Sequence, residues 1–135
     1  MFADADARAQ LEAITHPRIR DLVVAGVQES LGRAPYAMVV VPLMAEKGRY
    51  DFLNEIVVVD CSVASQIQRL MQRDNIDASL AQQMLSAQAS RAKRLIIADH
   101  VLSNDDADRS ALCCHIAALH TRFCTRSLRF QATPH

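Results

Sequence analysis

Two arginines four residues apart are the side chains best suited to hold phosphate groups. Arg69 and Arg73 lie in a stretch whose apolar residues recur at helical spacing, so one side of a helix would carry both guanidinium groups. A guanidinium group binds phosphate oxygens through paired hydrogen bonds, which suits stabilisation of a transferring phosphoryl group. The spacing therefore favours recognition of a phosphate chain. The alternative is a solvated helix face without a ligand.

The distribution of charge along the chain supports recognition of a phosphate chain. Lys and Arg number 15 and Asp and Glu number 15, so the chain has no net charge and is not a general nucleic-acid binder or a polybasic membrane binder. Phosphate recognition must then come from a local cluster. Residues 62–94 are such a basic segment, with Arg69, Arg73, Arg91, Lys93 and Arg94 against Asp74 and Asp77. We expect this segment to be a helical lid between two strands.

Apolar runs predict the strands that hold this lid. Tyr36–Pro42 and Glu55–Asp60 are apolar on both faces, as in buried strands of a parallel sheet, and residues 98–102 predict a further short strand. Each of the two longer runs ends in a polar or loop-forming residue, where ligands bind in open α/β sheets. The sequence therefore predicts an α/β fold.

Capping residues predict the helices. Asp4 would cap a short helix that the His16–Pro17 dipeptide breaks, and Pro17 would begin a second helix that Gly32 closes. Ser62 and Asp77 would cap the two lid helices. A final helix is expected from Asp105 to Phe123, with a frayed tail from Thr125.

Composition and motifs narrow the function classes. The 135 residues, half of them hydrophobic, suit one globular domain, and no apolar run approaches the roughly 20 residues of a membrane span. The N-terminus has no signal-peptide pattern, and the four cysteines show no CxxC spacing, so we expect free thiols and a cytoplasmic protein. His120 and Cys124 offer too few ligands for a structural zinc site, so no metal site is expected.

Glycine usage adds a sharper exclusion. The three glycines, Gly26, Gly32 and Gly48, form neither a GxGxxG nor a GxxxxGK[ST] pattern. The sequence therefore contains no glycine-rich loop that could cradle phosphates.

Four blocks of sequence, in order, carry a family resemblance. They are Phe2 with LEAITHPRIR at 11–20, VVPLMAE at 40–46 with Tyr50 after it, VVVDC at 57–61 with QIQRLMQRD at 66–74, and ADHVLSN at 98–104 preceded by Gln88, Arg91 and Arg94. In this order and spacing they resemble dephospho-coenzyme A kinases, a family of P-loop nucleotide kinases. LHTRF at 119–123 matches the last helix of the family, so the resemblance covers almost the whole chain.

The resemblance implies a fold and a reaction. The fold would be a helix-rich P-loop NTPase-like parallel sheet flanked by helices, divided into a helical acceptor-substrate region (1–35), core strands (36–61), a helical lid (62–95), and a core strand with the C-terminal helix (96–135). The reaction would transfer the ATP γ-phosphoryl group, with Mg²⁺, to the 3′-hydroxyl of dephospho-coenzyme A, the last step of coenzyme A synthesis.

The resemblance also implies roles for single residues. Arg69, Arg73 and Arg91 would meet the ATP phosphates. Asn104 would lie in the adenine-side loop. His16, Pro42, Leu43, Glu46 and Tyr50 would lie on the acceptor side. Simpler interpretations stay open for three of these: a helix-entry residue for His16, a surface acid for Glu46 and an aromatic residue at the rim of the core for Tyr50.

The sequence also departs from the family pattern. Ala45 replaces a bulky apolar residue, Arg94 replaces a lysine, and His100 and Ser103 replace acids, which puts the adenine contacts in doubt. The family's first strand, phosphate loop and catalytic base precede the block that begins at Phe2. We therefore expect this chain to lack catalytic residues and to be inactive alone. The alternatives are a non-catalytic nucleotide- or coenzyme A-binding module and a helical interaction domain. Sheet edges left open would favour a homo-oligomer.

Overall fold

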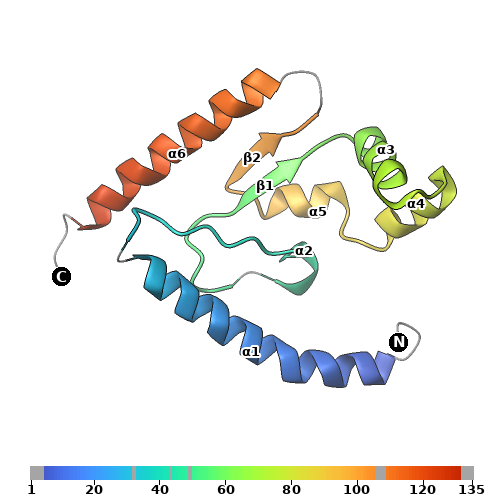
Figure 1. The fold of residues 1–135 in the computed structure, drawn as a ribbon, viewed down its shortest axis with the longest axis horizontal. Helices are drawn as coiled ribbons and strands as arrows, with labels where there is room; N and C mark the ends of the chain where they lie inside the picture. Colours follow the sequence, from blue (N-terminus) through green and yellow to red (C-terminus); the bar gives the residue numbers. More distant parts are fainter. Residues whose placement is uncertain (1–4, 32, 43, 49, 106–108, 132–135) are drawn as a thin grey trace. The chain divides into compact units, whose positions relative to one another are not determined.

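The computed structural model describes residues 5–31, 33–42, 44–48, 50–105 and 109–131 of the chain. Its elements, in chain order, are α1 (Ala5–Leu31), α2 (Met44–Lys47), β1 (Val57–Asp60), α3 (Val63–Asp74), α4 (Ala78–Ser86), α5 (Arg91–Ile96), β2 (His100–Ser103) and α6 (Arg109–Gln131) (Figure 1). They form two compact units. The first comprises residues 1–40 and 123–135, and the second comprises residues 41–122.

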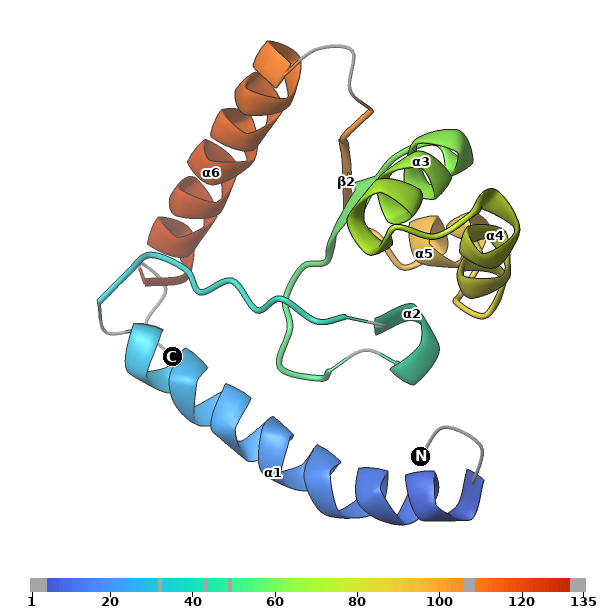
Figure 2. The ribbon, with the colours of Figure 1, turned by 45° about the vertical axis from the view of Figure 1, so that its right-hand side comes forward.

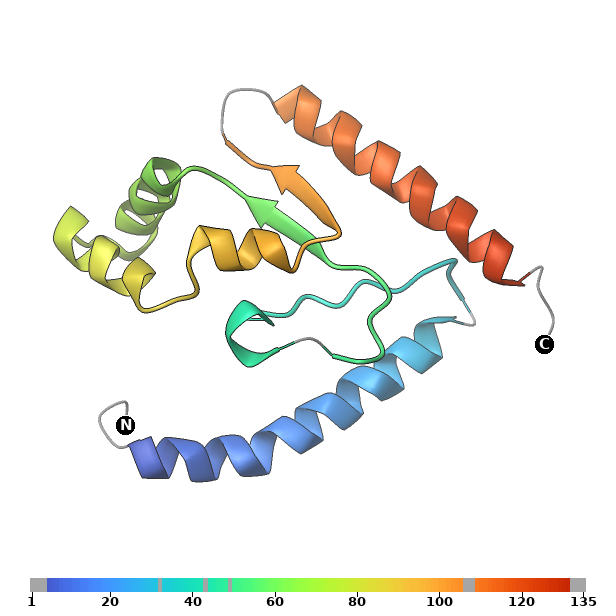
Figure 3. The same ribbon diagram turned by 180° about the vertical axis from the view of Figure 1, so that it is seen from behind.

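A parallel strand pair is the centre of the second unit. Val57 lies opposite His100, and Asp60 lies opposite Ser103. Parallel strands need a long crossover, and here the chain passes through α3, α4 and α5 between β1 and β2 (Figure 3). Helix α5 packs against β1. The α/β class with a parallel sheet is confirmed, and so are strands in the 55–60 and 98–102 regions.

Two helices of the basic segment, α3 and α4, begin where the sequence predicts. The Ser62 side chain accepts a hydrogen bond from the Ser65 N–H at 3.2 Å and caps α3. Asn75, in the left-handed region at φ 53°, ends this helix. Asp77 then caps α4 by accepting from the Leu80 N–H at 2.8 Å. Helices α3 and α4 lie side by side (Figure 2).

Helix α1 corrects the predicted break at His16–Pro17. A single helix runs from Ala5 to Leu31 with Pro17 inside it. Proline lacks the N–H that would bond the carbonyl four residues earlier, and its cost is about 3 kcal/mol in a helix interior. Strong helix formers on both sides offset this cost, and the helix curves (Figure 2). The predicted caps Asp4 and Gly32 lie outside the described residues.

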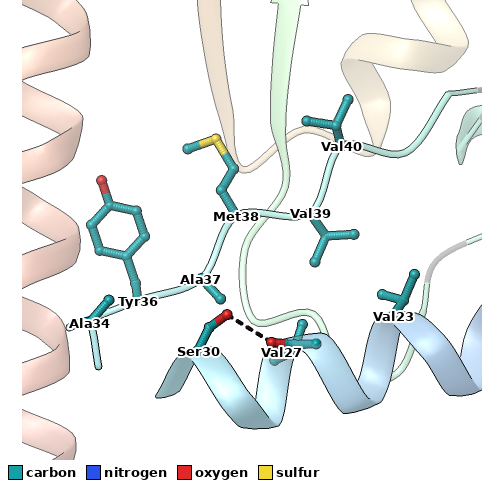
Figure 4. Close-up of a pocket in the computed structure, with 10 residues that line it drawn as sticks. Val23, Val27, Ser30, Ala34, Tyr36, Ala37, Met38, Val39 and Val40 are labelled. Carbon is teal, nitrogen blue, oxygen red and sulfur yellow. Dashed lines mark hydrogen bonds between the residues drawn. The ribbon is translucent and has the colours of Figure 1, made fainter. Parts of the chain in front are cut away.

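The predicted strand Tyr36–Pro42 is also wrong. In the described residues the sheet has only β1 and β2, and residues 36–41 are in no strand. The chain here keeps the alternation of a strand, because Ala37 and Val39 point toward α1 whereas Met38 and Val40 point away (Figure 4). An apolar extended segment becomes a strand only when its backbone joins a ladder of hydrogen bonds with another strand, and no such ladder forms here in the described residues.

Helix α6 is longer at its C-terminal end than predicted. It begins at Arg109 and continues to Gln131, so the expected frayed tail from Thr125 is helical up to that point. No glycine or proline lies between Thr125 and Gln131, so nothing local stops the helix. Asp105, the expected start, precedes the helix, and its carboxylate accepts hydrogen bonds from Ser62 and Ser65 at the start of α3, as described below.

The hydrophobic core is small. Among the described residues, Ile56 at 6% exposure and Ala81 at 0% are the only buried hydrophobic side chains. The Ile56 N–H donates to the Asp99 carboxylate at 2.7 Å, which ties the start of β1 to the start of β2. No helix in the described residues combines the length and apolarity needed to cross a bilayer.

Candidate functional site

A buried carboxylate at the end of β1 holds one of the predicted phosphate-binding arginines. The Arg91 Nε donates to both Asp60 oxygens at 3.0 and 2.9 Å, and its Nη2 donates to Oδ2 at 2.6 Å. Asp60 is 7% exposed, whereas Arg91 is half-exposed. The hydrogen bonds and the charge of Arg91 hold the pKa of Asp60 below its usual value of 3.8, although burial opposes this shift. The same hydrogen bonds raise the pKa of Arg91.

Arg69 connects α3 to the loop after β2. Its Nη2 donates to the Asn104 carbonyl at 2.7 Å, and the side chain is half-buried. The Asn104 N–H in turn donates to the Asp60 carbonyl at 2.7 Å. The structure therefore brings two predicted nucleotide-side residues, Arg69 and Asn104, into contact at the carboxyl end of the sheet.

Asp105 adds a negative charge at the start of α3. Its carboxylate accepts hydrogen bonds from the Ser62 N–H at 2.9 and 3.0 Å and from the Ser65 hydroxyl at 2.8 Å. The hydrogen bond from the Ser62 backbone is the main reason why the pKa of Asp105 lies below its usual value. A carboxylate is favourable here because unpaired N–H groups give a helix N-terminus a partial positive charge.

Arg94 completes the group of arginines. Its Nη1 donates to the Ala89 carbonyl at 2.7 Å and its Nη2 to the Gln66 side-chain oxygen at 3.4 Å. Its positive charge also contributes to lowering the pKa of Asp60. We call the set Asp60, Arg69, Arg91, Arg94, Asn104 and Asp105 the C-terminal edge cluster. It carries three positive and two negative side chains, so it keeps an excess positive charge that suits an anion.

Arg73 lies in different surroundings from Arg69. Its side chain is 72% exposed, and it pairs with the neighbouring Asp74 through Nε at 2.7 Å and Nη2 at 2.9 Å. The two guanidinium groups expected on one helix side therefore make separate contacts, one to a backbone carbonyl and one to a surface carboxylate. The hydrogen bonds to Asp74 raise the pKa of Arg73, which stays charged.

The predicted acceptor-side residues are spread along the chain. His16 is exposed on α1 in the first unit, whereas Pro42, Glu46 and Tyr50 belong to the second unit. Glu46 accepts a hydrogen bond from the Ala89 N–H at 2.6 Å and so connects α2 to the segment before α5. Tyr50 stacks on Phe52 with ring centroids 5.3 Å apart. Leu43 lies outside the described residues.

His100 and Ser103 lie at opposite ends of β2. His100 begins the strand and pairs with Glu55, far from the carboxyl end of the sheet. Ser103 ends the strand opposite Asp60. No group of three potential metal-ligating side chains occurs in the described part of the chain.

The first unit holds a separate groove. Its volume is about 490 Å³, and apolar side chains of α1 and of the segment after it form its walls (Figure 4). The Ser30 hydroxyl, the only side-chain hydroxyl in its walls apart from that of Tyr36, donates to the Gly26 carbonyl at 2.7 Å. The groove contains none of the residues that the sequence predicts as a site.

Sequence reasoning left Asp60 and Asp105 out of the site. Asp60 has a local signal, because it is the polar residue that directly follows an apolar strand. Asp105 has none, because its partner Ser62 lies 43 residues earlier. Such a contact depends on how the crossover returns the chain to the sheet.

The fold and the cluster together define a class of protein. A parallel strand pair with a helical crossover and charged side chains at its carboxyl ends is typical of α/β proteins that bind ligands at this edge. A family model described as dephospho-CoA kinase matches residues 1–109. The chain belongs to the dephospho-CoA kinase family, and the resemblance seen in its sequence is confirmed.

Relatives and a solved structure agree with this family. A dephospho-CoA kinase of Xanthomonas campestris is 51% identical over 108 residues, which are 78% of this chain and 51% of the relative. One from Burkholderia thailandensis is 40% identical over 126 residues, 91% of this chain and 60% of the relative. The structure of a Campylobacter jejuni dephospho-CoA kinase is similar with a TM-score of 0.54 and 25% identity, over 97% of this chain and 59% of that one. The chain thus spans about half of the first relative and three-fifths of the other two.

Proposed function

We propose that this chain takes part in the ATP-dependent phosphorylation of the 3′-hydroxyl of dephospho-coenzyme A, the last step of coenzyme A synthesis. The single observation that carries this proposal is the C-terminal edge cluster, found in a chain whose relatives are dephospho-CoA kinases. Phosphoryl transfer depends mainly on positioning and on charge stabilisation, which arginines at a sheet edge can supply. We place the protein in the cytoplasm, where its small-molecule substrates would be.

Three arginines would bind the ATP phosphates. Arg69 is supported by its half-buried position and its fixed contact with Asn104. Arg91 is supported by its fixed orientation against Asp60. Arg73 is exposed and would exchange Asp74 for a phosphate oxygen. Asn104 would lie beside the adenine.

The acceptor side is proposed from the resemblance. The resemblance assigns His16, Pro42, Leu43, Glu46 and Tyr50 to recognition of dephospho-coenzyme A. Among the described members, Glu46 is already held by a backbone N–H, so it would position α2 more directly than it would contact the ligand.

Mg²⁺ would accompany ATP in such a reaction, held by the phosphates together with one or two carboxylates. The described residues contain no group of three candidate ligands, and the carboxylate at the end of β1, Asp60, is engaged by Arg91. We therefore assign no residue to Mg²⁺ and derive no step through it.

We further propose that the chain alone binds its substrates without turnover, because its sequence contains no GxxxxGK[ST] motif. A coupled assay with ATP, Mg²⁺ and dephospho-coenzyme A tests turnover. A thermal-shift series with dephospho-coenzyme A, ATP and coenzyme A tests binding. We expect stabilisation by ATP and dephospho-coenzyme A without product formation. Turnover near that of a full-length relative would contradict the absence of catalysis, and no stabilisation by either substrate would contradict the proposed function.

A further inference from the structure

We infer that Asp60 is a positioning residue for phosphate binding, which holds one edge of the Arg91 guanidinium group so that the opposite edge can meet a phosphate chain. This inference rests on the proposed function, since it assigns how one of the phosphate-binding arginines is kept in place.

The contacts divide the guanidinium group into a bound and an available edge. Arg91 has five N–H donors, and Asp60 takes the edge formed by Nε and Nη2. In the described residues no partner is seen for Nη1. Half of the side chain is exposed, so we assign the edge that includes Nη1 as the one that an incoming anion meets.

Asp60 is well anchored for this role. It is the last residue of β1, its side chain is 7% exposed, and its carbonyl accepts the Asn104 N–H at 2.7 Å. A buried carboxylate on a strand constrains a long arginine side chain that would otherwise sample many rotamers. Fixing the arginine beforehand removes part of the entropy cost of binding.

The opposite role is competition, in which Asp60 would hold Arg91 away from anions. Two features favour positioning. The contact uses one edge of the guanidinium group and leaves donors over, and Arg94 also acts on Asp60 with its positive charge, which offsets the repulsion that this carboxylate would exert on an anion. Removing the charge of Asp60 distinguishes the two roles. Triphosphate binding should weaken if Asp60 positions Arg91, and it should tighten if Asp60 competes with the anion.

The test measures triphosphate binding by calorimetry. The full chain is titrated with inorganic triphosphate, without Mg²⁺, and separately with ATP. We expect Asp60→Asn and Arg91→Lys each to weaken triphosphate binding by about tenfold, because a charge-assisted, oriented hydrogen bond is lost. The double variant should be no weaker than Arg91→Lys alone, because Asp60 acts through Arg91.

Matched controls come from an exposed ion pair elsewhere. Glu29 and Arg33 form an i, i+4 pair at 3.1 Å on side chains that are 68% and 76% exposed. Glu29→Gln and Arg33→Lys make the same chemical changes there, and we expect both to leave triphosphate binding unchanged. Circular dichroism of each variant checks that it is folded. If Asp60→Asn does not fold, the inference is tested with Arg91→Lys alone. This variant should fold, because Arg91 is half-exposed and lysine keeps its positive charge.

Four results would overturn the inference. They are absence of triphosphate binding by the wild-type chain, tighter binding by Asp60→Asn, unchanged binding by Arg91→Lys, and additive effects in the double variant. Failure of the proposed function gives a different result, in which triphosphate binds and depends on Asp60 while ATP and dephospho-coenzyme A do not bind.

Discussion

Single ion pairs in this protein share their chemistry but differ in their surroundings. Asp60 and Arg91 pair at the carboxyl end of β1 with the carboxylate buried, whereas Arg73 and Asp74 pair on an open helix surface. Surface pairs contribute little to stability because water and salt screen them, while a buried carboxylate depends strongly on its partner. The first pair should therefore matter for both stability and binding, and the second mainly for binding.

Asp60→Asn should lower stability in a way that depends on pH. The pKa of Asp60 in the folded chain lies below its ordinary value of 3.8, so the pair stabilises the fold above that pH, and the stabilisation is lost as the pH falls through the folded pKa. Urea unfolding at pH 7 should show a loss on the order of 1 kcal/mol. The difference from wild type should shrink as the pH is lowered from 4. Asp74→Asn serves as the control and should change stability very little at either pH. A difference for Asp60→Asn that grows in acid would contradict the assignment.

Arg69→Gln and Arg73→Gln should both weaken ATP binding, but only Arg69→Gln should also lower the stability of the fold. Arg69→Gln removes the bond to the Asn104 carbonyl, so we expect a lower urea midpoint and weaker ATP binding. Arg73→Gln removes an exposed pair, so we expect an unchanged midpoint and weaker ATP binding. Chemical unfolding and calorimetry of both variants check this. Equal losses of stability would show that the two arginines do not differ as described.

At the scale of elements, the sequence predicts what local signals determine. The apolar run before Asp60 predicts β1, and Ser62 and Asp77 predict the beginnings of α3 and α4. Local signals fail where a distant partner decides the outcome. Residues 36–41 have the composition of a strand, but strand formation also needs a hydrogen-bonding neighbour.

In the candidate site, the arginines can be predicted from local sequence signals, but their contacts cannot. Arg69 and Arg91 can be found from residue type and position, since arginines of a basic helical segment are natural phosphate ligands. Their contacts cannot, because Arg91 meets a carboxylate 31 residues away and Arg69 a carbonyl 35 residues away. Residues this far apart in the sequence come into contact only when the crossover between β1 and β2 folds back onto the sheet.

Pro17→Ala should strengthen α1. The proline lies inside a helix of 27 residues and removes one backbone hydrogen bond there. Alanine restores the N–H donor and is the best helix former, with an advantage of up to about 3 kcal/mol at an interior position. We expect more helical circular dichroism and a higher melting temperature. Unchanged or lower helicity would show that the chain is not helical through Pro17 in solution.

At the scale of the whole molecule, the small core limits stability. Only Ile56 and Ala81 are buried hydrophobic residues among those described, while large apolar side chains such as Val59 at 61% and Val101 at 49% stay exposed on the strands. Stability arises mainly from apolar burial, so little remains to oppose the entropy of the unfolded chain.

Self-association should bury the apolar side chains that are exposed on the strands. In the described residues β1 has a strand on one side only, and an open, apolar edge is a template for pairing with another chain. We expect analytical ultracentrifugation to show concentration-dependent dimers or larger species. Val59→Lys places a charge on β1 and should shift the population toward monomer, whereas Leu22→Lys, on an exposed position of α1, is the control. A compact, highly stable monomer at all concentrations would contradict this expectation.

The central claim is that the arginines at the carboxyl end of the sheet bind the phosphates of ATP. Nitrogen-15 labelling of the arginine side chains, followed by NMR titration of the full chain with ATP, tests it most directly. We predict saturable shifts of the Nε signals of Arg69 and Arg91 at up to millimolar ATP, with no change for Arg33, which follows the end of α1. Shifts of equal size at every arginine, or none at Arg69 and Arg91, would contradict the claim.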